Sequence, residues 1–378
     1  MKIITNVQKS GSGGIYHAFT SFLGYLNQTN QKKIKITGID VQHKDNSHTQ
    51  AYQNKEGIFT LNSTFCDFPG IEKAARIADS LKDMENLYEE VIEQYRQLIK
   101  LEKPDVILLN GTYYLPWCLL MASKSLRIPT ILHYHGILSK EITSWEDKSR
   151  KLLEGMEKSF NLPQTFYIFP SKLAKKVVEE EVFGNKVKRF TISPNPVPRH
   201  FFTKRKKKKN NNLGIVSRWA NVKNSSYAVE LGAHNSRQNN KLSINVVTDL
   251  NEKSKGYEKL SELVNFKKIM SSQKLAGFYS RMGVVISPSF FETYGNVAQE
   301  ALASNTPALV NSQMGVAETY KKLGLKDWVV DFNLVGEVFK KAKELIDQEV
   351  PLKIRKTLYE EYSPEATSLR MLNAIKSV

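Results

Sequence analysis

Two glutamates flank the point at which a predicted helix begins. Glu292 precedes this point and Glu300 follows it, and the apolar stretch 284–287 before them has the composition of a buried strand. Gly295 allows close backbone approach at the turn into the predicted helix 296–303. A helix start offers unpaired N–H groups and about half a positive charge. The pattern therefore predicts a seat for a pyrophosphate, with carboxylates beside it.

The two carboxylates would bind different parts of such a ligand. Glu300 lies one helical turn beyond Asn296 on the same face, where its carboxylate can accept hydrogen bonds from ribose hydroxyls. Glu292 is placed to hold hydroxyls of the group that the diphosphate carries. One hydrogen bond to a charged acceptor contributes about 1.5–3 kcal/mol, which is enough to orient a sugar. The residues expected to bind the donor at this turn are Tyr294, Gly295, Asn296, Val297 and Glu300.

Two cations, Arg218 and Lys223, follow the predicted strand 213–216. They suit the same ligand, because a departing nucleoside diphosphate develops negative charge on its β-phosphate. Arg, Lys and backbone N–H groups can neutralise that charge. Both side chains can therefore pair with a diphosphate, and the family resemblance given below implies that they hold it.

A glycine-rich loop follows the predicted first strand, 3–7. It has the first two glycines of a dinucleotide fingerprint, but Tyr16 stands where the third is required, which argues against NAD binding. We expect the backbone of Gly13 and Gly14 to approach the donor, although a simple tight turn is equally compatible with the sequence. In the same half of the chain, His135 directly follows the predicted strand 130–134.

The order of predicted elements indicates two α/β domains. Short apolar strands alternate with helical stretches such as 71–101 in both halves of the chain, which is typical of parallel sheets. The further strands predicted are 34–39, 105–109, 166–169, 243–247 and 307–310. Three prolines and a basic run mark the change between the halves. We predict domains at 1–198 and 213–360, a basic linker at 199–212, and a C-terminal helix at 361–378 that crosses back to the first domain.

These segments together resemble the GT-B superfamily of retaining glycosyltransferases, in particular the family 4, or group 1, type. A Glu-x7-Glu motif after a Pro-Ser strand end is matched by Glu292 and Glu300. The stretch 216–224 is similar to the family's Gly-Arg…Lys-Gly segment, with Ser217 and Asn224 in place of its glycines. The resemblance covers most of the chain. It implies two Rossmann-like, doubly wound domains that face each other across a cleft.

The resemblance also implies roles for individual residues. Glu292 and His135 are implied as catalytic residues beside the donor sugar, and His133 is interpreted as a core histidine. Asn195 corresponds to a structural asparagine, and Glu318 is interpreted as a residue that stabilises a helix start. The sequence lacks the Asp-x-Asp metal clamp of the other glycosyltransferase fold, so we expect no catalytic metal and no cofactor besides the donor.

Composition limits the remaining possibilities. Lys and Arg total 55 against 38 Asp and Glu, a formal net charge of +17 that favours an anionic partner. Part of the excess is the run 204–209, which is either a solvated linker or a contact for anionic lipid. Two cysteines without a motif suggest a reducing, cytoplasmic location. No apolar stretch approaches the roughly 18 residues of a membrane span.

The residues and the resemblance together predict a metal-independent hexosyltransferase, and the resemblance implies that it is a retaining enzyme. It would move a hexose or N-acetylhexosamine from a nucleotide-diphosphate sugar, UDP rather than GDP, to a hydroxyl acceptor. The expected acceptor is a glycan or lipid-linked saccharide of cell-surface polysaccharide synthesis, at the inner face of the plasma membrane. Front-face attack is preferred over double displacement. The alternatives are a sugar-nucleotide epimerase of the same architecture and a basic nucleic-acid-binding protein, although no nucleic-acid module is recognisable.

Overall fold

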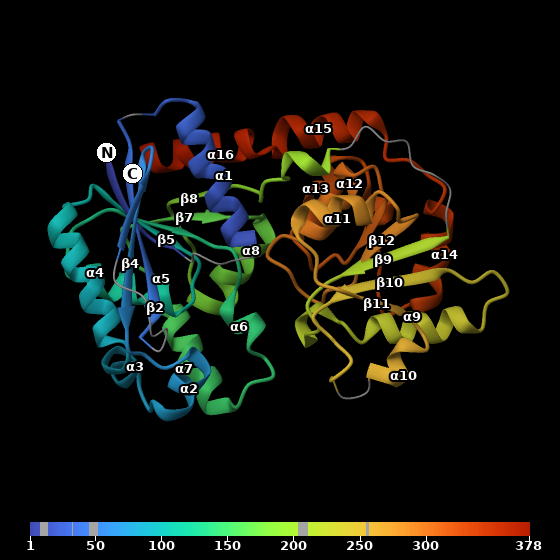
Figure 1. The fold of residues 1–378 in the computed structure, drawn as a ribbon, viewed down its shortest axis with the longest axis horizontal. Coiled ribbons are helices and arrows are strands. Elements are labelled where there is room, and N and C mark those ends of the chain that lie inside the picture. Colours follow the sequence, from blue (N-terminus) through green and yellow to red (C-terminus); the bar gives the residue numbers. More distant parts are fainter. Residues whose placement is uncertain (8–13, 32, 45–51, 203–210, 255–256) are drawn as a thin grey trace. The chain divides into compact units, whose positions relative to one another are not determined.

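The computed structural model describes residues 1–7, 14–31, 33–44, 52–202, 211–254 and 257–378. By their internal contacts these residues form two compact units, and each is an α/β layer structure with its own sheet (Figure 1). Unit 1 comprises Met1–Pro170, Ala174–Ser193 and Ser368–Val378, and unit 2 comprises Ser171–Leu173 and Pro194–Thr367. The predicted end of the first domain at 198 and the observed division before Pro194 both fall in the proline-containing segment.

The sheet of unit 1 has eight strands in the order β3-β4-β2-β1-β5-β6-β7-β8. All neighbours pair in parallel except β3 and β4, which form an antiparallel hairpin at one edge. The strands are β1 (Lys2–Asn6), β2 (Lys35–His43), β3 (Tyr52–Glu56), β4 (Phe59–Cys66), β5 (Val106–Asn110), β6 (Thr130–His133), β7 (Thr165–Phe169) and β8 (Phe190–Ile192). Central strands such as β5 are buried along their whole length, as expected when helices cover both faces.

Most helices of unit 1 connect successive parallel strands of its sheet, and the C-terminal helix packs against the same unit. They are α1 (Gly14–Gln28), α2 (Ile71–Ile77), α3 (Leu81–Leu87), α4 (Glu89–Glu102), α5 (Tyr114–Ser123), α6 (Leu138–Glu141), α7 (Asp147–Lys158), α8 (Lys172–Val177), the π-helix η1 (Val178–Phe183) and α16 (Pro364–Lys376). Helix α16 begins among residues of unit 2, but its later residues Met371, Leu372 and Ile375 are buried in the core of unit 1.

The stretch 71–101 is helical, as expected, but it is divided into the three helices α2, α3 and α4. Helix α2 ends where Ala78 adopts an extended conformation (φ −76°, ψ 141°). Ser80 then caps α3, with its side chain accepting a hydrogen bond from the Asp83 N–H. A serine in this position favours a helix start over a helix interior, so it interrupts a stretch whose apolar spacing is otherwise continuous.

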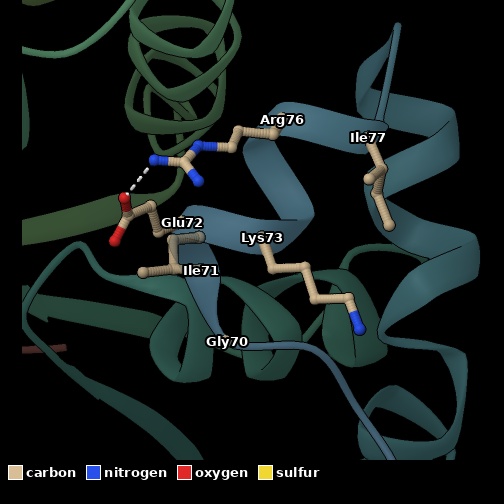
Figure 2. A pocket seen from close by; sticks show the side chains of 6 residues that line it. All are labelled: Gly70, Ile71, Glu72, Lys73, Arg76 and Ile77. Atoms are coloured by element: carbon tan, nitrogen blue, oxygen red, sulfur yellow. Dashed lines mark hydrogen bonds and ion pairs between the residues drawn. The ribbon is translucent and has the colours of Figure 1, made fainter.

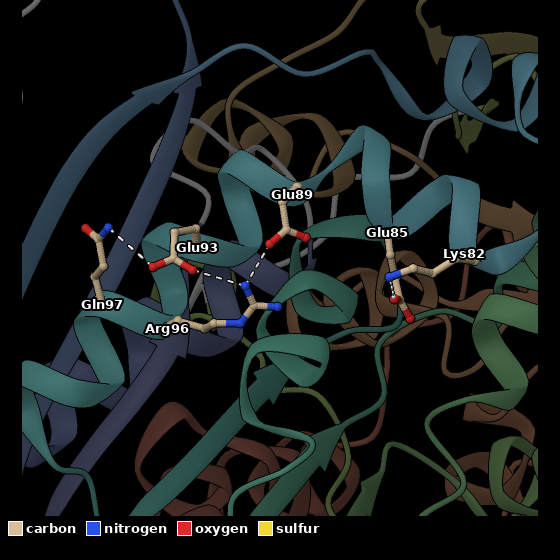
Figure 3. A network of polar contacts seen from close by, with 6 residues as sticks. All are labelled: Lys82, Glu85, Glu89, Glu93, Arg96 and Gln97. Carbon is tan, nitrogen blue, oxygen red and sulfur yellow. Dashed lines mark hydrogen bonds and ion pairs between the residues drawn. The ribbon is translucent and has the colours of Figure 1, made fainter.

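Helix α4 carries surface ion pairs among its own side chains (Figure 3). Arg96 Nη1 lies 2.7 Å from Glu89 Oε1 and 3.0 Å from Glu93 Oε2. Exposed pairs of this kind contribute only a few tenths of a kcal/mol each. The network therefore supports the helix, and no site residue predicted from the sequence belongs to it.

Unit 2 contains a five-stranded, fully parallel sheet in the order β11-β10-β9-β12-β13. The strands are β9 (Asn212–Val216), β10 (Ser243–Thr248), β11 (Asn265–Lys268), β12 (Val284–Ser287) and β13 (Ala308–Val310). Every residue of β12 and β13 is buried. Their valine, isoleucine and leucine side chains pack into one continuous core with the helices of this unit.

The helices of unit 2 include the one on which the predicted site depends. They are η2 (Arg199–Phe201), η3 (Asn221–Lys223), α9 (Tyr227–Ser236), α10 (Tyr257–Ser261), α11 (Ser272–Tyr279), α12 (Asn296–Ala303), α13 (Val316–Lys322), η4 (Lys326–Trp328), α14 (Val335–Leu345) and α15 (Leu352–Tyr362). Helix α12 has the bounds that the sequence predicts. The basic run 204–209 lies outside the described residues.

Across the described ranges, no helix has both the length and the apolar character needed to cross a membrane. Within the same ranges, no group of three or more His, Cys, Asp or Glu side chains could hold a metal ion.

Candidate active site

The strand order of unit 2 identifies where a ligand would bind to this sheet. Strands β9 and β12 are neighbours, but the chain leaves β9 toward β10 on one side and leaves β12 toward β13 on the other. The loops after these two strands therefore diverge at their carboxyl ends. In open parallel sheets such a divergence creates the crevice in which ligands bind. Lys223 lies on the first of these loops, and Glu292 lies on the second.

Lys223 and Glu292 meet at this point. Lys223 Nζ lies 3.2 Å from Glu292 Oε1, and both side chains are largely buried, with exposed fractions of 23% and 17%. Ser289 Oγ donates a hydrogen bond to the same carboxylate oxygen at 2.7 Å. A carboxylate oriented by two partners loses little further side-chain entropy when a sugar hydroxyl binds to it.

Backbone hydrogen bonds hold the Glu292 loop between its neighbours. The Phe290 N–H donates to the Val222 carbonyl at 3.0 Å, which ties this loop to the one after β9. The Glu292 carbonyl accepts from the Gly315 N–H at 3.0 Å, and the Glu292 N–H donates to Gln313, which ties it to the loop after β13. Three strand ends thus fix one short loop.

Gly295 makes the turn into α12. Its φ of +113° is in the region that L side chains rarely adopt, and a Cβ at this position would lie 2.7 Å from Met314 Cε and 3.0 Å from Val316 Cγ1. The glycine is therefore required by both conformation and space. No described side chain caps the start of α12. The helix thus begins without a side-chain acceptor for its first N–H groups, as an anion site requires.

Glu300 is partly buried on α12, and its Oε2 accepts a hydrogen bond from the hydroxyl of Tyr279 at 3.2 Å. Burial raises the pKa of Glu300 to about 8, while the Tyr279 hydrogen bond acts in the opposite direction. Burial also raises the pKa of Tyr279 well above its ordinary value. The sequence interpretation missed Tyr279, since it lies 21 positions from Glu300 and no local motif joins them.

The remaining predicted residues at this turn differ in what they can offer a ligand. Tyr294 is 2% exposed, and its hydroxyl contacts Gln299 and lies 3.1 Å from Thr319 Oγ1. Its ring is therefore a core group, and only its backbone can lie at the turn. Asn296 Oδ1 accepts from Asn195 Nδ2 at 2.9 Å, so both asparagines fix the entry to the helix. Val297 is half-buried.

The loop after β9 presents Arg218, whose side chain is exposed. Ser225 Oγ organises this loop, because it donates to the Arg218 carbonyl at 2.9 Å and accepts from the Ala220 N–H at 3.0 Å. Asn224 has a left-handed conformation (φ 50°, ψ 47°). Asparagine tolerates this conformation better than most residues, so the departure from the family's glycine leaves the loop geometry possible.

His133 and His135 lie in unit 1, at and just beyond the carboxyl end of β6. Their ring centroids are 4.0 Å apart. His133 is 6% exposed, and burial lowers its pKa to about 4. Burial and the neighbouring His133 lower the pKa of His135 well below its usual value. Both rings are therefore neutral at physiological pH and can hydrogen-bond without adding charge.

The glycine loop is only partly described. Gly13 lies outside the described residues, and Gly14 is the first residue of α1. Glu318 stabilises a helix start, as expected, but the helix is α8. Its carboxylate accepts from the Leu173 N–H at 2.6 Å and the Lys172 N–H at 3.1 Å.

A hollow of about 550 Å³ lies over α2 in unit 1, and none of the predicted site residues lines it (Figure 2). Its lining is Gly70, Ile71, Glu72, Lys73, Arg76 and Ile77. Arg76 pairs with Glu72 at 2.5 Å across one helical turn. The hollow is formed by one short helix and brings no convergent polar groups together, so it does not compete with the site of unit 2.

Comparison with known proteins agrees with this geometry. Residues 197–363 match the family model described as Glycosyl transferases group 1. No curated protein matches the chain by sequence.

Solved structures match the whole chain. A sucrose-phosphate synthase from Thermosynechococcus elongatus superposes with a TM-score of 0.75 at 14% identity, covering 100% of this chain and 98% of that one. A trehalose-6-phosphate structure from E. coli, bound with UDP-2-fluoro glucose, superposes with a TM-score of 0.70 at 10% sequence identity. The match covers 100% of this chain and 99% of that one. An α,α-trehalose 6-phosphate synthase from Burkholderia multivorans superposes with a TM-score of 0.67 at 12% sequence identity. This match covers 100% of this chain and 96% of that one. At these identities the likeness establishes the fold, which is GT-B.

Proposed function

We propose that this glycosyltransferase, which has a GT-B fold and a group 1 domain over residues 197–363, moves a hexose or N-acetylhexosamine from a nucleotide-diphosphate sugar to a hydroxyl acceptor with retention. The observation that supports the proposal best is the meeting of Lys223 and Glu292 where β9 and β12 diverge, beside the uncapped start of α12. This arrangement offers a cation, an oriented carboxylate and backbone donors to one ligand.

The donor diphosphate would lie against the start of α12, with Arg218 and Lys223 beside it. As the bond between sugar and diphosphate breaks, negative charge grows on the β-phosphate, and the two cations and the helix start stabilise it. Ion pairing with a bound diphosphate would draw Lys223 away from Glu292, leaving the carboxylate for sugar hydroxyls. Glu300 would accept from the ribose hydroxyls.

His135, in unit 1, is the second residue proposed to act on the sugar, and its role comes from the family resemblance. A neutral imidazole can hydrogen-bond a sugar hydroxyl without opposing the positive charge that develops at the anomeric carbon. We prefer front-face departure and attack, with the β-phosphate receiving the acceptor proton, over a double displacement. The E. coli structure was solved with a UDP sugar, and this favours UDP as the nucleotide of the donor for this chain. The proposed acceptor is a glycan or lipid-linked saccharide, used in the cytoplasm at the inner face of the membrane.

A panel of sugar nucleotides tests the proposal. We expect one UDP sugar to raise the melting temperature and, with a saccharide acceptor, to be consumed with release of UDP. No stabilisation by any sugar nucleotide would contradict it. Incubation with the donor alone separates transfer from epimerisation, since an epimerase would convert the sugar nucleotide without an acceptor.

We further propose that the reaction needs no metal, because Arg218, Lys223 and the start of α12 would together neutralise the charge on the diphosphate. Turnover is expected to be unchanged when EDTA is added to enzyme freed of metal by dialysis. Loss of turnover that Mn²⁺ restores would contradict this mechanism.

A further inference from the structure

One buried carboxylate in unit 1 joins two loops at the carboxyl edge of its sheet. Glu157, on α7, is 0% exposed. It accepts hydrogen bonds from the Leu138 N–H at 2.8 Å, the Ser139 N–H at 2.9 Å and Thr112 Oγ1 at 3.4 Å. No local sequence motif marks this glutamate, because its partners are 18 to 45 positions away.

The partners of Glu157 belong to the loops that follow β5 and β6. These strands are neighbours, and Asn110 at the end of one pairs in register with His133 at the end of the other. Thr112 comes just after β5, and the turn 136–139 comes just after His135. The carboxylate therefore fixes the far end of the short segment that carries His135, while the strand fixes its near end.

Stability alone does not account for a carboxylate at this position. Burial raises the pKa of Glu157, which shows that the charged form is costly here, although the N–H groups of Leu138 and Ser139 oppose the shift. Among the described residues, Glu157 forms no ion pair with a cation. A buried carboxylate that accepts hydrogen bonds from backbone N–H groups fixes the position of those groups, since leaving them unpaired would be costly. Here the geometry specified is that of the 136–139 turn.

We propose that Glu157 is a positioning residue for His135, acting through the backbone of Leu138 and Ser139. The inference rests on the proposed function, in which His135 contacts the donor sugar. The buried carboxylate holds the turn so that the His135 ring keeps its place against His133, 4.0 Å away. Small displacements of a group that contacts the reacting centre lower turnover more than substrate binding.

The test is Glu157→Gln, which keeps the size of the side chain but replaces one acceptor oxygen with an amide that cannot accept from an N–H. We expect kcat to fall about tenfold or more, with the donor KM changed less than about threefold. Glu154→Gln is the matched control: it lies on the same helix, is 44% exposed, and pairs with Arg150 only at 3.8 Å. The control is expected to match the wild type.

A double-mutant cycle with His135→Ala distinguishes positioning from general destabilisation. If Glu157 acts through His135, adding Glu157→Gln to His135→Ala causes no further loss of kcat. Losses that multiply would overturn the inference, as would wild-type kcat in a folded Glu157→Gln variant. If Glu157→Gln fails to fold, Thr112→Val removes one of the three donors and is used in the same cycle, with a smaller expected loss.

The cycle also separates this inference from the proposed function. A wild-type enzyme that uses no sugar nucleotide would refute the function itself. A wild type that is active, a His135→Ala variant that is impaired, and a cycle that is multiplicative would refute only the role of Glu157.

Discussion

The carboxylate of Glu292 is oriented from two directions, by the Lys223 ammonium at 3.2 Å and the Ser289 hydroxyl at 2.7 Å. Preorganised groups of this kind contribute to catalysis because they need no reorientation when charge develops. A substitution that removes one of these oriented groups is therefore expected to lower turnover strongly.

Removing this carboxylate tests the assignment directly. We expect Glu292→Ala to lower kcat at least ~100-fold, the scale for losing one preorganised electrostatic contact, and Arg218→Ala to have a similar effect. Steady-state kinetics with the preferred donor measures both. Glu360→Ala, an exposed glutamate on α15, serves as the control. Near-wild-type turnover in folded Glu292→Ala would refute the assignment.

Glu300 predicts a pH dependence. Because burial raises its pKa from 4.5 to about 8, the folded state retains a proton that the unfolded state releases above 4.5. The contribution of Glu300 to the free energy of unfolding therefore falls as pH rises from about 4.5 to about 8. Chemical denaturation across this range should show wild type losing stability relative to Glu300→Gln. Parallel curves for the two proteins would contradict the buried, protonated carboxyl.

The sequence could predict these residues only where they share a local segment. Glu292, Gly295 and Asn296 lie within one strand-loop-helix pattern, so their proximity follows from chain order. Lys223 approaches Glu292 only because β9 and β12 are neighbours, and Glu157 approaches the His135 segment only because α7 packs there. Contacts of this kind depend on tertiary packing, which no spacing within the sequence specifies.

At the scale of elements, the decisive feature is that loops from three strand ends are hydrogen-bonded to one another around residues 290–293. The strands β12 and β13 and helix α12 could be predicted closely because they are short, apolar and punctuated by Pro288, Gly295 and Pro307. The edge hairpin of β3 and β4 was not predicted, since its strands are more polar and one of them pairs only at the sheet edge.

Gly295 provides a prediction at this scale. Gly295→Ala should lower the free energy of unfolding by at least about 1 kcal/mol, because the alanine would be strained at φ +113° and crowded by Met314. Gly24→Ala is the matched substitution. Gly24 lies inside α1 with nothing within 4 Å of a new Cβ, so a gain of about 0.5–1 kcal/mol is expected. Equal effects in urea denaturation would show that the turn is not constrained as described.

At the scale of the whole molecule, the net charge of +17 remains the feature that the donor site alone does not require. A diphosphate needs only a few cations, and the excess is large enough to attract a negatively charged surface. This motivates the proposal that the enzyme meets a lipid-linked acceptor at an anionic membrane.

Vesicle sedimentation tests this proposal. We expect the protein to bind vesicles with anionic lipid more strongly than neutral ones, and to be released as salt rises, because screening weakens exposed charges. A variant with the six basic residues of 204–209 replaced by asparagine should bind less. Equal partition to neutral and anionic vesicles would contradict the proposal.

Helix α16 determines where the chain can be cut into separate domains. Met371, Leu372 and Ile375 fill the core of unit 1 beside Ile3 and Phe22, so both chain ends belong to the same unit. A fragment that stops at 198 would expose the apolar surface that α16 covers. A circular permutant that opens between Ser193 and Pro194 and links the original termini would instead make each unit nearly continuous in sequence. Such a rearranged chain offers a starting point for producing unit 2 separately.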